Sequence, residues 1–106
     1  MRADEFYDQK TVSITEWWVC WASFPSVHWG RLRVFWDGSA DATFDGRNVV
    51  GFARREYAGF YLAEDEFSPV NALDAEDEAD LGRPASTLVP PDWPERPESF
   101  RYLGTY

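Results

Sequence analysis

The apolar run from Trp17 to Phe24 constrains the fold of this chain more than any other feature. Seven of its eight residues are apolar and three are tryptophan. From Val12 onward alternate residues are apolar except Glu16, and between Trp17 and Trp21 both alternating sets are apolar. A strand with this pattern enters a sheet from an exposed end and is covered on both faces at its centre. The run therefore predicts a central β-strand over residues 11–24.

Two Asp-Gly pairs, Asp37-Gly38 and Asp45-Gly46, lie eight residues apart and predict two tight turns. Glycine at the second turn position tolerates a positive φ, so this pair is a strong hairpin signal between alternating segments. Such alternation precedes and follows the first pair, which predicts an antiparallel meander. Its strands would be residues 11–24, 28–36 and 40–44.

The segment after the second turn is open to two interpretations. Its apolar residues recur at helical spacing, but residues 52–67 also fit an extended strand. The content of Ala, Arg, Glu and Leu favours a helix, which would cover one face of the sheet. The apolar stripe of that helix would consist of Phe52, Ala53, Tyr57, Phe60 and Tyr61.

These patterns predict an α+β fold, with a small antiparallel sheet of three to five strands and one main helix packed on it. If residues 52–67 are extended, the alternative is a small all-β barrel or sandwich. A chain of 106 residues supports one modest core, so we expect a single domain over residues 1–106. Its expected parts are an N-terminal arm (1–10), a sheet and helix core (11–67), an acidic segment (68–83) and a Pro-rich C-terminal tail (84–106).

The net charge of −9 is concentrated in one segment. The 17 residues from Glu64 to Asp80 contain eight acids and no base, whereas the rest of the chain has 11 acids and 10 bases. Phosphate groups require a cationic surface, so we expect neither nucleic acid nor an anionic membrane as a partner. The segment is either a solvated face or a surface for a basic protein partner. The candidate partner-binding residues are Glu64, Asp65, Glu66, Asp74, Glu76, Asp77, Glu78 and Asp80.

The six tryptophans offer a second kind of binding surface. Alternation places Trp17 and Trp18 on opposite faces, so one of them leaves the main core face. Exposed rings would stack on a glycan or a Pro-rich peptide, and the alternative is that the rings form the core. Trp93 lies in the Pro-rich tail and either belongs to a ligand segment or folds back onto the domain. The candidate stacking residues are Trp17, Trp29 and Trp93.

No set of residues indicates catalysis, a cofactor or a metal. Cys20 and His28 are the only Cys and His, and a thiol in an apolar run is usually inert. The acids lack the spacing and the central Gly of an EF-hand loop, and there is no Gly-rich phosphate loop. We therefore expect no enzyme activity, no cofactor and no metal site.

Taken together, size and charge predict a non-enzymatic, acidic protein-binding domain. By analogy of charge and size alone, it would act as acidic immunity-type inhibitors do when they neutralise basic toxins. The alternative is a module that binds a glycan or a Pro-rich peptide through exposed Trp. The chain shows no basic-then-apolar leader and no apolar run near 18 residues, so we expect a soluble cytoplasmic protein.

Overall fold

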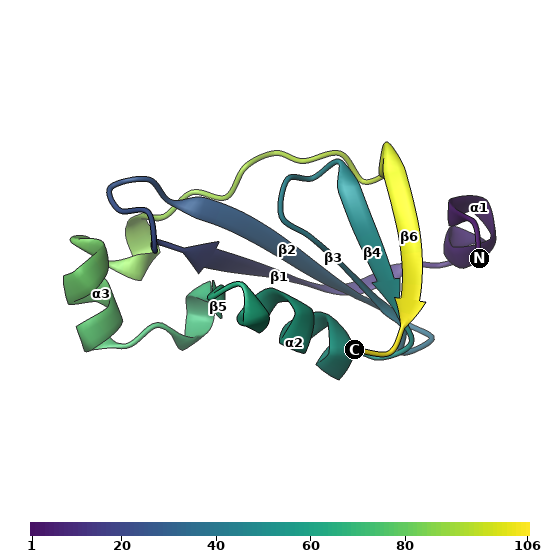
Figure 1. Ribbon diagram of the computed structural model, residues 1–106, viewed down its shortest axis with the longest axis horizontal. Coiled ribbons are helices and arrows are strands. Elements are labelled where there is room, and N and C mark those ends of the chain that lie inside the picture. The colour runs from purple at the N-terminus through teal and green to yellow at the C-terminus, as the bar shows by residue number, and fades with distance from the viewer.

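A mixed sheet of six strands carries the fold (Figure 1). The structure is a computed structural model and describes all residues from 1 to 106. The strands are β1 (Val12–Cys20), β2 (His28–Phe35), β3 (Ala40–Thr43), β4 (Asn48–Phe52), β5 (Ser68–Pro69) and β6 (Ser99–Gly104). Their order in the sheet is β5-β1-β2-β3-β4-β6.

The connection of the strands confirms the predicted α+β class and the meander, but the sheet has six strands instead of the three to five predicted, and one pair differs in direction. The strands β1 to β4 pair antiparallel, and the hairpin around Asp37-Gly38 pairs Val34 with Ala40. However, β6 runs parallel to β4, so the sheet is not purely antiparallel. The chain reaches β6 only after crossing the sheet, and this crossover allows a parallel pair.

Three helices accompany the sheet: α1 (Ala3–Tyr7), α2 (Arg55–Glu64) and α3 (Ala75–Leu81). Short 3₁₀ turns lie at Val70–Ala72 and Ala85–Thr87. Helix α2 packs on one face of the sheet, here called the first face, so the all-β alternative does not apply (Figure 1). The chain between α3 and β6 crosses the opposite, second face (Figure 1).

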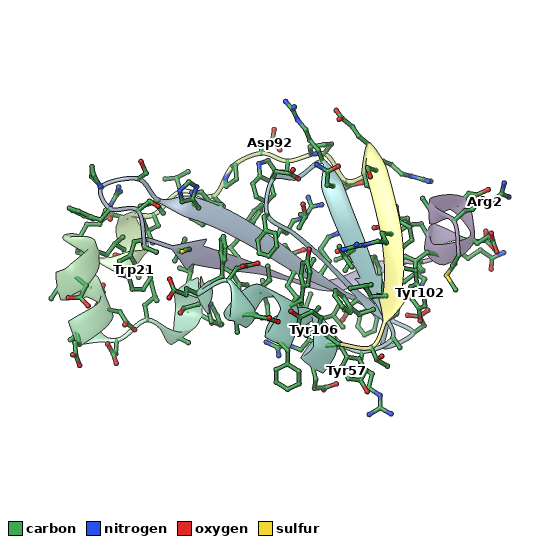
Figure 2. The ribbon with its side chains drawn as sticks, viewed as in Figure 1. Arg2, Trp21, Tyr57, Asp92, Tyr102 and Tyr106 are labelled. Carbon is green, nitrogen blue, oxygen red and sulfur yellow. The ribbon has the colours of Figure 1, made fainter.

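The position of β1 corrects the prediction of a central strand. β1 pairs with β2 along its length, but on its other side β5 reaches only Trp18 and Val19. The strand also ends at Cys20, and Trp21 lies beyond it on the side of the molecule that carries α3 (Figure 2). Its two-sided apolar pattern arises because α2 covers Trp18 while other tryptophans cover Trp17 on the second face.

Strand β4 has no counterpart among the predicted strands. Four of its five residues are buried, so it shows no polar alternation that would mark it as a strand. The helix after it begins at Arg55 instead of near Phe52, and this shift changes its buried face. Phe60 is 59% exposed instead of belonging to the apolar stripe. The buried helix residues are Ala58, Gly59 and Leu62.

The core on the first face joins α2 to four strands. Its fully buried centre contains Leu32, Phe52 and Leu62, with Trp18 5% exposed at its β1 side. An ion pair fastens the helix to β1, because Arg55 donates from Nε and Nη2 to the Glu16 carboxylate at 2.8 and 2.7 Å. This hydrogen-bonded carboxylate raises the pKa of Arg55 above its ordinary value.

The second face is covered at one end by the N-terminal arm. This arm contains the short helix α1, and Phe6 anchors it with only 2% exposure. The Phe6 ring lies 4.9 Å from Phe100 and 5.9 Å from Phe35, centroid to centroid. Large rings bury much apolar area, so this cluster extends the core across the sheet.

Residues 84–98, here called the C-terminal segment, cover the rest of the second face (Figure 1). Figure 2 shows Asp92 of this segment on the side of the sheet opposite α2. Two arginines of β2 hold its backbone: Arg31 Nη1 donates to Pro94 O at 3.0 Å, and Arg33 Nη1 donates to Glu95 O at 2.9 Å. The Pro-rich tail is therefore bound to the sheet before it enters β6.

The packing of Trp93 on the second turn predicts a difference between two glycine variants. Gly38 and Gly46 both have a positive φ, 91° and 77°, where a side chain costs about 1–2 kcal/mol. A Cβ at Gly46 would also lie 2.5 Å from the Trp93 ring, whereas nothing lies within 4 Å at Gly38. In urea unfolding, Gly46→Ala should lose clearly more stability than Gly38→Ala. Equal losses would mean that Trp93 does not rest on this turn.

Candidate functional site

The eight candidate acids lie on α3, at one end of an elongated molecule of 42 × 23 × 21 Å, and at the end of α2 that is nearer to α3 (Figure 1). Glu64, Asp65 and Glu66 close α2, and the other five belong to α3 and its N-cap. None of the eight forms an ion pair, because all five ion pairs of the protein join other residues. We call the stretch Glu64–Asp80 the acidic end. Its charge is uncompensated within the stretch.

Three of these acids also hold local structure. Asp74 caps α3 by accepting from Asp77 N at 2.8 Å, and Asp77 accepts in return from Asp74 N at 3.1 Å. Glu78 accepts from Ala85 N at 2.6 Å and so ties α3 to the chain that follows. The side chains of the other acids make no hydrogen bond and are exposed. These free acids are Glu64, Asp65, Glu66, Glu76 and Asp80.

The three candidate stacking residues come together on the second face. Trp17 lies edge-to-face with Trp29 at 6.0 Å and with Trp93 at 5.4 Å, centroid to centroid. All three rings are half-buried, so they form a packed cluster instead of an exposed row. Trp93 folds back onto the domain, as one of the two interpretations of the tail predicted. Trp36, at the first turn, is the tryptophan that remains exposed, at 74%.

An apolar groove of about 590 Å³ lies beside this cluster. Its lining comes from β1 and β2, from the turn after β5 and from the C-terminal segment. The turn after β5 belongs to the acidic end, so this segment contributes Val70 and Asn71 to the groove, although none of the eight acids lines it. The apolar lining residues are Ile14, Trp17, Trp29, Val70, Leu88 and Pro90.

A buried charge network lies further along the second face. The Asp41 carboxylate is fully buried and accepts from Arg33 Nε at 3.0 Å and from Arg33 Nη2 at 2.5 Å. The Tyr7 hydroxyl donates to the same carboxylate at 2.6 Å. Burial and the Asp41 charge raise the pKa of Tyr7, so the hydroxyl stays protonated and donates its hydrogen bond to Asp41. Burial lowers the pKa of Arg33, but the bonds and charge of Asp41 outweigh burial and raise it.

Arg31 is a second buried arginine and lacks a carboxylate of its own. It is 4% exposed, and its Nε and Nη2 have no hydrogen-bond partner in the protein. Burial lowers the pKa of Arg31, and the neighbouring Arg33 charge lowers it further. The network was not anticipated, although Arg31 and Arg33 alternate with apolar residues on β2. That alternation was a usable signal that both point to one face.

Cys20 and His28 face each other directly in the register of β1 and β2. Cys20 is buried and no hydrogen bond joins its sulfur to the imidazole, so the pair lacks the contact that a nucleophile and its base require. Groups of three or more His, Cys, Asp or Glu side chains placed to hold a metal ion are not found.

Comparison with protein-family models, with curated proteins and with solved structures finds no match to this chain. Among its helices, none combines the length and the apolar character needed to cross a bilayer. What the chain binds must therefore be inferred from its own surface.

The two buried arginines predict opposite outcomes for the same substitution. Arg33→Met would leave the Asp41 carboxylate buried and unpaired, which should lower the free energy of unfolding by about 3–5 kcal/mol. Arg31→Met would remove a buried charge that has no carboxylate partner, so stability should stay within about 1 kcal/mol or rise. Urea unfolding of both variants measures the difference. A large loss for Arg31→Met would contradict this assignment.

Proposed function

We propose that this chain is a non-enzymatic protein-binding domain whose acidic end receives a basic partner protein. One observation carries the proposal: the apolar groove of about 590 Å³ takes part of its lining, Val70 and Asn71, from the segment that bears the eight acids. An apolar patch bordered by charge is the usual composition of a protein interface. The acidic segment and the tryptophan cluster, which the sequence suggested separately, thus both contribute residues to one groove.

The unpaired acids give this surface its preference for a basic partner. Eight acids without a base repel one another, so the folded protein tolerates this repulsion instead of relieving it internally. Complementary charge on a partner raises the association rate and excludes acidic competitors. Apolar contacts in the groove would then slow dissociation, because desolvated aromatic pockets carry much of the binding energy.

The nearest functional analogy is an immunity-type protein that neutralises a basic toxin. The analogy rests on size and on charge, since an inhibitor of this kind must cover a cationic surface with an anionic one. The resulting expectation is specific: the partner would be strongly basic, and binding would weaken as salt screens the surface charges.

A second candidate function is recognition of a Pro-rich peptide or a glycan by tryptophan. The convergence of Trp17, Trp29 and Trp93 favours it, and the first two rings line the groove. Stacking on rings depends little on salt, whereas recognition by the acidic end depends on it strongly. Titration with a Pro-rich peptide and with oligosaccharides, followed by tryptophan fluorescence, tests this candidate.

Neutralising the free acids tests the leading proposal. The variant carries Gln or Asn at Glu64, Asp65, Glu66, Glu76 and Asp80, and it spares the acids that cap and tie α3. Its stability should be unchanged or slightly raised, since exposed charges contribute little to folding. Affinity capture from the source cell, with proteins identified by mass spectrometry, should yield a basic protein with wild type and little of it with the variant.

A matched control removes the same number of charges elsewhere, from exposed acids whose side chains make no hydrogen bond. These are Asp8, Glu56, Asp92, Glu95 and Glu98. The control should capture the partner as wild type does. Equal capture by the neutralised variant at low and high salt, or capture of no basic protein by wild type, would contradict the proposal.

A further inference from the structure

We infer that the partner docks by adding an extended, basic segment as a new strand on the open edge of β1. The inference rests on the proposed function, because it names the binding mode of the same surface. It adds a backbone contribution that charge alone does not provide. Peptides bind sheet edges in this way when main-chain hydrogen bonds supply affinity and pockets for side chains supply specificity.

The edge is open because β5 is short. β5 pairs with β1 only at Trp18 and Val19, so the preceding residues of β1 have a partner strand on one side only. A register shift interrupts the strand between Val12 and Ile14. The regular stretch without a partner strand on this side is therefore Ile14–Trp17, and the turn after β5 contacts β1 near its Trp17 end. The same four consecutive residues line the groove, so the groove runs along the edge itself.

The direction of the backbone groups follows from the register. Phe35 N donates to Ser39 O at 2.9 Å, so the peptide groups of Phe35 point toward β3. In an antiparallel ladder the direction alternates, so Val34 points toward β1. Ile14 is opposite Val34 and points back at it. Thr15 must then point its N–H and C=O away from β2, toward the open side.

Few of the usual devices protect this edge. Sheet edges are commonly blunted by Lys, Pro or inward charge, and Ile14–Trp17 contains neither Lys nor Pro. Its one charge, Glu16, is committed to Arg55. Ile14 is 52% exposed and would offer apolar contact to an incoming side chain. The edge is thus suited to pair with another strand.

Charge selects the occupant of the edge. An added strand would lie in the groove beside the turn after β5, and β5 and this turn are part of the acidic end. Asp74 follows the groove residue Asn71 by three positions, and Glu66 precedes β5 by two. A second copy of this chain carries the same net charge of −9 and would be repelled. A basic segment with alternate apolar side chains pairs with the edge of β1, places its apolar side chains in the groove and complements the negative charge.

Two blocked peptides test the inference. The probe is an eight-residue peptide of alternating Val and Lys, and its matched form carries an N-methyl group on every second peptide nitrogen. The methyl groups remove main-chain donors but keep the charge and the side chains. The N-methylated form should bind about tenfold more weakly or worse at low salt. In wild type, the parent peptide should also slow the exchange of the Thr15 amide hydrogen.

Two variants of Thr15 provide the test from the side of the protein. Thr15→Pro removes the outward N–H, which a sheet edge tolerates, and Thr15→Ala keeps it. Thr15→Pro should weaken the parent peptide about tenfold, whereas Thr15→Ala should leave its Kd within about twofold. If Thr15→Pro does not fold, the wild-type exchange of the Thr15 amide and the N-methylated peptide decide the matter.

The outcomes separate this inference from the function on which it rests. The strand addition would be overturned if both peptides bind equally well and the Thr15 exchange is unchanged. If this binding is also lost in the variant neutralised at the five free acids, the acidic end remains the binding surface. Full binding to that neutralised variant would contradict the proposed function. Absence of binding by either peptide would overturn the strand addition. A dimer in sedimentation that Thr15→Pro dissociates would assign the edge to a second copy and also overturn it.

Discussion

The fully buried carboxylate of Asp41 is the constraint on which the packing of the second face of the sheet depends. A carboxylate inside a protein costs several kcal/mol unless it is paired and hydrogen-bonded. Arg33 supplies the charge and two hydrogen bonds, and Tyr7 supplies a third. Tyr7 belongs to the N-terminal arm, and Arg33 also holds the carbonyl of Glu95 in the C-terminal segment. One buried group in β3 thereby brings both ends of the chain onto the sheet.

This arrangement explains which surfaces remain for binding. α2 closes the first face through the apolar core, while the arm and the C-terminal segment close the second face through aromatic and charged contacts. The basic residues Lys10, Arg31 and Arg33 face this interior, and Lys10 pairs with Asp37 at 3.1 Å. These internal contacts engage three of the ten basic residues, and the first base after the acidic end is Arg83. The charge of the acidic end stays uncompensated because the segment contains no base of its own.

The turns and the helix, which depend on residues close together in the sequence, could be predicted from the sequence. Asp37-Gly38 and Asp45-Gly46 specify turns by φ alone, so the meander could be anticipated, and the Ala and Leu content around Ala58 indicated a helix. The parallel pairing of β6 and the strand β4 could not be predicted, because both depend on where segments distant in the sequence pack. β4 is buried on both faces and therefore lacks alternation. For the candidate site, the acids were evident from composition. That the acidic end contributes Val70 and Asn71 to the groove lined by Trp17 and Trp29 follows only from the way β5 returns to β1.

Native-state amide exchange of an Asp41→Asn variant tests most directly whether one buried carboxylate holds both chain ends. The amides to follow are Phe6 and Lys10 in the arm, Glu98 at the end of the C-terminal segment and Ser99 just after it. Their hydrogen bonds go to Arg2, Tyr7 and Arg47. Loss of the charge should speed exchange at all four together, while amides inside α2 keep their protection. Wild-type exchange rates at the arm and the C-terminal segment in this variant would contradict the account.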